Sequence, residues 1–269
     1  MAGASSESLA QVKQDLEGTI NSANLTVAGQ LFQVLDVLED QAALRRALTD
    51  PSREPSQRKD LVANIFGSKV EPTALEIVQA LAEKRWSKER DLGDGLEQLA
   101  TTVVAAAAER DGLTGLNRLE TELLDFNRTV ASSHEVQAAL THPQATSEAK
   151  TTLARRLSEH VSPEARLLID QAISSPRGKK PQDLIADFVK GIAARQQRWI
   201  ATVNVAAPLS SQTQERLAKA LNAYFGRDLK LNVNVDPSVI GGMKVQVGDE
   251  VVDSSIESRL QDLKRKLAG

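Results

Sequence analysis

Hydrophobic residues recur at helical spacing along most of the chain, from the start to about residue 198. The first of these stripes consists of Leu9, Val12, Leu16 and Ile20. Apolar positions separated by three or four residues predict amphipathic helices. The stripes are interrupted at Pro and Gly, for example at Thr49-Asp50-Pro51, where a helix is expected to stop. The pattern therefore predicts a mainly helical protein over this part of the chain.

Part of the helical pattern occurs twice. The segment from Ala47 to Pro51 reappears as the segment from Ala139 to Pro143, with an offset of 92 residues (141 − 49 = 92). The apolar residues that follow match at a similar offset, and Pro72 has its counterpart in Pro163. A repeated order of helices and proline stops predicts an internal duplication, that is, two tandem small helical bundles. Chance similarity between leucine-rich helices is the alternative.

The last seventy residues follow a different pattern. Apolar and polar residues alternate from Leu229 to Val235 and again from Met243 to Val247, which is typical of half-buried strands. Gly248-Asp249 suits a two-residue hairpin turn before the return strand at Val251. Helices with capping patterns are expected before and after these strands. The sequence predicts a mainly α protein whose small α/β C-terminal domain contains a β-hairpin, divided into residues 1–95, 96–198 and 199–269.

Composition limits the kinds of partner. The formal net charge is −3, so no overall positive field attracts nucleic acid. The chain has no cysteine, which excludes disulfides and thiolate-bound metals. No apolar run approaches the ~18 residues of a membrane span, and the N-terminus lacks the features of a signal peptide. We expect no direct membrane insertion.

Residues for catalysis or cofactor binding do not form a recognisable motif. The three histidines, His134, His142 and His160, are not at metal-ligand spacing. Gly241-Gly242 lies between predicted strands instead of opening a helix, which argues against a phosphate-binding loop. We therefore expect no enzyme activity, no cofactor and no metal. A nucleotide-binding enzyme that uses Gly241-Gly242 is the weakest of three hypotheses.

One predicted helix carries an unusual run of small residues. Thr101, Val104, Ala105 and Ala108 lie along one of its faces. Small side chains allow another helix to approach closely, so this face is a candidate docking surface for a partner helix. Packing inside the bundle is the alternative explanation.

The C-terminal pattern resembles the signature of the delta subunit of F-type ATP synthase, whose mitochondrial counterpart is the oligomycin-sensitivity-conferring protein. The resemblance depends on the joint spacing of several residues. These residues are Asp236, Gly241, Gly242, Val245, Gly248, Asp249 and Asp253. The usual subunit has one six-helix bundle, whereas the pattern here indicates two, as in longer forms of the family. The opening helix usual in the family is not evident near Leu9.

The resemblance implies a non-catalytic subunit of the peripheral stalk, at the cytoplasmic face of the cell membrane. Its expected partners are the N-terminal helices of the alpha subunits and the stalk subunit b. In the family a groove between the first and fifth helices of the bundle holds the alpha helix. Transferred to the second copy, this groove consists of Val104, Ala105, Ala108, Leu167, Leu168 and Gln171. Its counterpart in the first copy consists of Leu9, Val12, Leu16, Leu75, Val78 and Gln79. A helical adaptor unrelated to the synthase is the second hypothesis.

Overall fold

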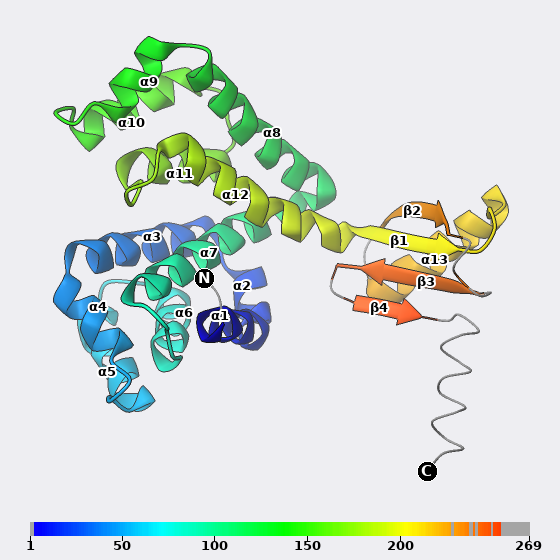
Figure 1. Ribbon diagram of the computed structural model, residues 1–269, viewed down its shortest axis with the longest axis horizontal. Coiled ribbons are helices and arrows are strands. Elements are labelled where there is room, and N and C mark those ends of the chain that lie inside the picture. Colours follow the sequence, from blue (N-terminus) through cyan, green and yellow to red (C-terminus); the bar gives the residue numbers. More distant parts are fainter. Residues whose placement is uncertain (1–2, 227–228, 237–238, 240–241, 249, 254–269) are drawn as a thin grey trace. The chain divides into compact units, whose positions relative to one another are not determined.

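The computed structural model describes residues 3–226, 229–236, 239, 242–248 and 250–253. Contacts within the chain divide it into two compact units, Met1–Ile192 and Ala193–Gly269. The first unit is helical, and the second contains a sheet (Figure 1). This confirms a mainly helical protein with a small α/β module at its C-terminal end.

The helices of the first unit have short connections. They are α1 (Ala4–Asp15), α2 (Glu17–Ser22), α3 (Leu25–Asp40), α4 (Ala42–Thr49), α5 (Pro55–Phe66), α6 (Pro72–Glu83), α7 (Glu89–Ala108), the 3₁₀ turn η1 (Glu109–Asp111), α8 (Gly112–Ala131), α9 (His134–Thr141), α10 (Ser147–Leu157), α11 (Pro163–Ser174) and α12 (Pro181–Gln196). A second 3₁₀ turn, η2 (Gln197–Trp199), leads into the sheet.

The element boundaries repeat along the chain. Helix α9 begins 92 residues after α4 (134 − 42 = 92), and α12 begins 92 residues after α7 (181 − 89 = 92). Helix α11 follows α6 at an offset of 91 (163 − 72 = 91). Helix α7 therefore ends the first set of helices and opens the second. The division of this unit at residues 95 and 96 remains a prediction.

The helix ends follow from local sequence. The side chains of Asn24, Ser133, Thr146 and Ser162 each accept a hydrogen bond from a backbone N–H in the first turn of the next helix. Such caps satisfy donors that have no partner within the helix. The first apolar stripe, from Leu9 to Ile20, forms two helices that meet at Leu16. Helix α7 runs without a break through Gly93 and Gly95.

Helix α7 forms the centre of the helical unit. It is 20 residues long, and most of its residues are buried. Figure 1 shows it between the first set of helices (blue to cyan) and the second set (green to yellow). It contacts α1, α2, α3, α4 and α6 of the first set of helices, and α8 and α11 of the second set. A helix enclosed in this way needs small or apolar residues on nearly every face, which explains its run of Val and Ala.

The second unit contains a four-stranded sheet in the order β2-β1-β3-β4. Its elements are β1 (Ile200–Val205), α13 (Ser211–Phe225), β2 (Lys230–Val235), β3 (Met243–Val247) and β4 (Glu250–Asp253). Strand β1 pairs in parallel with β2 and antiparallel with β3, and β3 pairs antiparallel with β4. Val247 pairs with Glu250, so the hairpin turn has two residues. Gly248 adopts φ 59°, as primed hairpin turns require.

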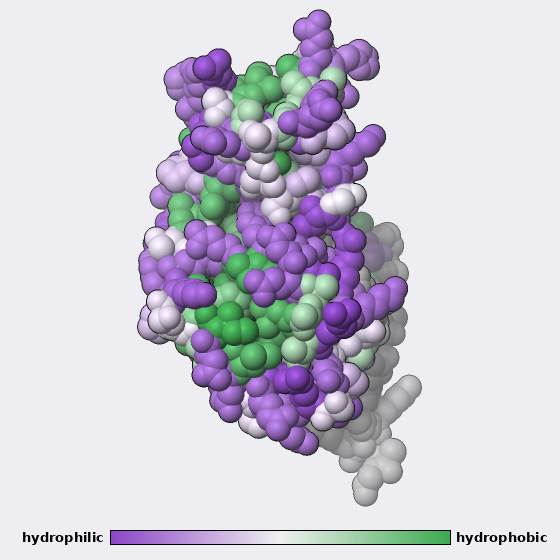
Figure 2. Space-filling model, turned by 90° about the vertical axis from the view of Figure 1, so that its left-hand side faces the viewer, coloured by the Kyte–Doolittle hydropathy of each residue, from purple (hydrophilic) through white to green (hydrophobic). Residues whose placement is uncertain are grey.

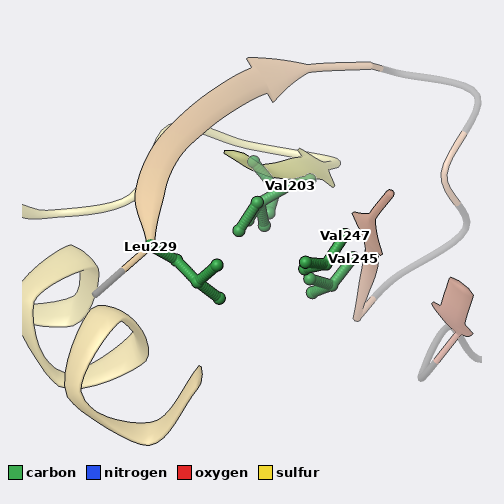
Figure 3. Packing of buried hydrophobic residues seen from close by; sticks show 6 residues of the cluster. Val203, Leu229, Val245 and Val247 are labelled. Atoms are coloured by element: carbon green, nitrogen blue, oxygen red, sulfur yellow. The ribbon is translucent and has the colours of Figure 1, made fainter. Parts of the chain in front are cut away.

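Alternating side chains of the strands form the core of this module. Figure 3 shows Val203, Leu229, Val245 and Val247 directed toward one another beneath the sheet. Apolar residues of α13, including Leu217 and Leu221, pack against this cluster. The opposite face of β1 is more polar and less buried. The period-two pattern of the sequence therefore predicts which strand residues are internal.

The C-terminal signature lies around this core. Asp236 follows β2, and its backbone N–H donates to the carbonyl of Val205 at 2.8 Å. Val245 is buried, and Gly242 adopts φ 76°. Gly241, Asp249 and the helix predicted after Asp253 lie outside the described residues. Helix α13 is capped by the side chain of Ser210, which accepts a hydrogen bond from the backbone N–H of Thr213.

Candidate partner-helix site

The six groove residues of the second helical copy come from α7 and α11. Val104, Ala105 and Ala108 are at most 2% exposed, and Leu168 is fully buried. Gln171 is 7% exposed, and Leu167 is half-buried. The two helices contact each other, and the line along which they meet is called the second-copy seam. Within this chain the seam is part of the core of the helical unit.

Helix α3 of the first copy packs along the same seam. It contacts both α7 and α11. The Nε2 atom of Gln171 donates to Oδ1 of Asp36 on α3 at 3.3 Å. At Gly29 on α3, a Cβ atom would lie 4.0 Å from Cδ1 of Leu167, so the two helices approach closely there. The chain therefore supplies a helix of its own beside the second-copy seam.

The first-copy counterpart is the seam between α1 and α6. Leu9, Val12, Leu16 and Val78 are at most 8% exposed, whereas Leu75 and Gln79 are half-buried. Helices α1 and α6 contact each other, and both contact α7. Next to this seam, Nζ of Lys84 lies 3.3 Å from Oδ2 of Asp15.

Sequence reasoning missed a buried ionic cluster between the two copies. Arg177, in the loop between α11 and α12, lies 2.9 Å from carboxylate oxygens of Glu39, Asp94 and Glu97. No local periodicity marks these residues, because Glu39 and Arg177 are 138 positions apart. The only available signal was the loop itself, which contains three cations within four residues, from Arg177 to Lys180.

The surface of the helical unit is mixed in character. Figure 2 shows areas of apolar surface separated by hydrophilic side chains on the face that it presents. One open hollow of about 610 Å³ is lined by residues of α4 and of the loop after it, including Arg46, and by residues just before and at the start of α7, including Trp86 and Lys88.

The structure does not bring the three histidines together. His134 opens α9, His142 follows it, and His160 lies after α10; all three are exposed. Over the described part of the chain, no group of three or more His, Cys, Asp or Glu residues could hold a metal ion. In that same part, no helix is long and apolar enough to cross a membrane.

A helical unit whose central helix is shared by two similar sets of helices, followed by a small mixed sheet, defines a mainly helical protein with a repeated set of helices. Comparison with known proteins identifies the class more closely. The family model described as ATP synthase delta (OSCP) subunit matches residues 16–103 and again residues 97–267. The second match includes α8 to α12 and the sheet module, whereas the first covers helices alone. The two matches overlap within α7.

Relatives match over the full length. The chain is 51% identical to ATP synthase subunit delta of Pseudarthrobacter chlorophenolicus over 275 residues, which cover 100% of both chains. It is 50% identical to that of Renibacterium salmoninarum, again over 100% of both chains. It is 38% identical to that of Streptomyces coelicolor, over 100% of this chain and 98% of the relative. The chain belongs to the ATP synthase delta (OSCP) subunit family, in a long form, and is a non-catalytic structural subunit of the stator.

Proposed function

We propose that this subunit connects the catalytic head of the ATP synthase to its peripheral stalk, by binding N-terminal helices of the alpha subunits and the stalk subunit b. The full-length match to delta subunits carries this proposal. In this function the protein lies at the cytoplasmic face of the cell membrane as a peripheral part of the complex. A rotary machine needs a static connection that resists torque, and a packed helical unit is suited to that task.

We place the alpha-helix site on the first copy, at the seam of α1 and α6. The corresponding seam of the second copy already has α3 packed along it. A partner helix there would have to displace contacts such as the one between Asp36 and Gln171. On the first copy, half-buried Leu75 and Gln79 remain accessible to a partner. Burial of apolar area contributes about 25 cal/mol per Å², so one docked helix supplies several kcal/mol before the cost of ordering.

Calorimetric titration of the full chain with a synthetic peptide of the alpha-subunit N-terminus tests this proposal. We expect binding by the native chain. Leu75→Glu is expected to weaken it by at least about tenfold, because a charge would enter an apolar contact. The matched control is Leu153→Glu, at a half-buried leucine of α10 in the second copy. Circular dichroism verifies that both variants keep their helices.

Three outcomes would count against parts of this proposal. Absence of heat with the native chain at high micromolar peptide contradicts alpha binding by the isolated subunit. Weakening by Leu153→Glu alone would place the contact on α10 of the second copy and not at the seam of α1 and α6. Copurification from membranes with the alpha and b subunits tests the proposed partners themselves, and its failure would contradict binding to them.

A further inference from the structure

The ionic cluster around Arg177 joins three elements. The side chain of Arg177 is 1% exposed, although it comes from a loop. Its Nε donates to Oε1 of Glu39 and its Nη1 to Oε2 of Glu97, each at 2.9 Å. Its Nη2 lies 2.9 Å from Oδ1 of Asp94, in an orientation that does not make a hydrogen bond. Glu39 belongs to α3 of the first copy, and the other two carboxylates belong to the shared helix α7.

The backbone around Arg177 is adapted to this position. Arg177 has φ 52° and, among the residues that the structure describes, is the one non-glycine residue with positive φ. This conformation costs a residue with a Cβ atom about 1 kcal/mol or more, so the contacts of the side chain must hold it. Nη2 of Arg90 also donates to the carbonyl of Arg177 at 3.0 Å.

Helix α7 is adapted to the position of Arg177 as well. A Cβ atom at Gly93 of α7 would lie 2.8 Å from Nη2 of Arg177 and 3.0 Å from Oε1 of Glu39. Glycine at this position therefore lets the guanidinium reach the helix. Burial lowers the pKa of Arg177, but the carboxylates of Glu97, Glu39 and Asp94 more than offset this and raise it. The side chain remains a cation within the cluster.

The equivalent loop of the first copy is built differently. Trp86 is the third residue after α6, just as Arg177 is the third residue after α11. Trp86 is 8% exposed and donates from Nε1 to the carbonyl of Leu81 at 2.9 Å, within its own copy. The second copy has a cation at the corresponding place, directed toward α3 of the first copy. The two copies therefore differ at this equivalent position.

We propose that Arg177 is an ionic latch that holds the two helical copies together as one rigid body. Glu39 is the contact that the latch makes across the copies, while Asp94 and Glu97 fix the guanidinium on the shared helix. Gln171 with Asp36, and the rings of Phe32 and Phe188 at 6.3 Å, provide further contacts between the copies. The latch is a property of the chain alone; only its use in resisting torque rests on the proposed connection between the catalytic head and the stalk.

Distance measurements between spin labels test the latch. The chain contains no cysteine, so Asn64→Cys on α5 and Thr152→Cys on α10 introduce two unique labelling sites, both at exposed positions. We expect a narrow distance distribution in the full chain. Arg177→Met is expected to broaden it and to lower the thermal midpoint by roughly 5–10 °C, because three carboxylates lose their buried counter-ion.

The matched control is Arg155→Met. Arg155 also pairs closely with a carboxylate, that of Asp170 at 2.8 Å, but it is 60% exposed and acts within the second copy. This control should leave the distribution unchanged. A narrow distribution in folded Arg177→Met protein would overturn the latch.

Glu39→Gln provides a milder test if Arg177→Met fails to fold. It keeps the shape of the side chain but removes the charge that links the copies, and it is expected to broaden the distribution to a smaller degree. When both changes are combined, the loss of stability should be smaller than the sum of the two single losses. Strictly additive losses would show that Glu39 and Arg177 are not coupled, and the latch would be rejected.

Discussion

Replacing Ala105 by glutamate is expected to unfold the helical unit or to destabilise it by about 3–5 kcal/mol. Ala105 is 1% exposed, in the middle of the central helix α7. A carboxylate at this position would be removed from water without a counter-ion, and the added atoms have no space between packed helices. Urea unfolding followed by circular dichroism measures the effect.

The control for Ala105→Glu is Ala138→Glu, at an exposed alanine of α9. This change should alter stability by no more than about 0.5 kcal/mol, as is usual for surface positions. The pair also distinguishes the two explanations of the small-residue face. If Ala105→Glu protein stays folded with native stability and only loses binding of an alpha peptide, the face is an open docking surface and not core.

Replacing Gly115 by alanine is expected to cost about 2–3 kcal/mol of stability. Gly115 lies in the first turn of α8, where the chain reverses after α7. A Cβ atom there would lie 2.0 Å from the carbonyl oxygen of Ala108 and 2.9 Å from Cβ of Asp111. Because the oxygen belongs to the backbone, relief requires the corner between the two helices to move.

Gly18→Ala is the matched control for this change. Gly18 lies in α2, and a Cβ atom there would meet nothing within 4 Å. Alanine in an open helical position should stabilise the protein by about 0.5–1 kcal/mol, because it restricts the unfolded chain. Thermal and urea unfolding of both variants test the prediction. Equal effects of the two substitutions would show that the corner at Gly115 is not tightly packed.

Much of the fold follows from short stretches of sequence. The caps at Asn24 and Ser162 and the proline starts at Pro72 and Pro163 set helix ends through contacts within a few residues. The duplication is visible because these stops recur at nearly constant offsets. The C-terminal strands follow from alternation, since side chains on a strand point to opposite faces.

Local sequence patterns predicted the candidate partner-helix site less well than the fold. The run at Val104, Ala105 and Ala108 indicates close helix packing, but the composition of a face does not reveal which helix covers it. In the structure all three side chains are buried, and α3 of the first copy packs against α7 and α11. The groove on the second copy remains a prediction, and our proposal that the alpha helix binds the first copy depends on this packing.

Sequence alone therefore determined the class of fold, the repeated helices, the strand pairing of the hairpin and the family. These features depend on periodicity and on turn residues, which act over a few positions. Only the tertiary structure decided that α7 is enclosed by both sets of helices and that Arg177 meets Glu39 from 138 positions away. Such contacts arise from the packing of complete helices, and no local pattern encodes which charged side chain the fold brings to a buried carboxylate.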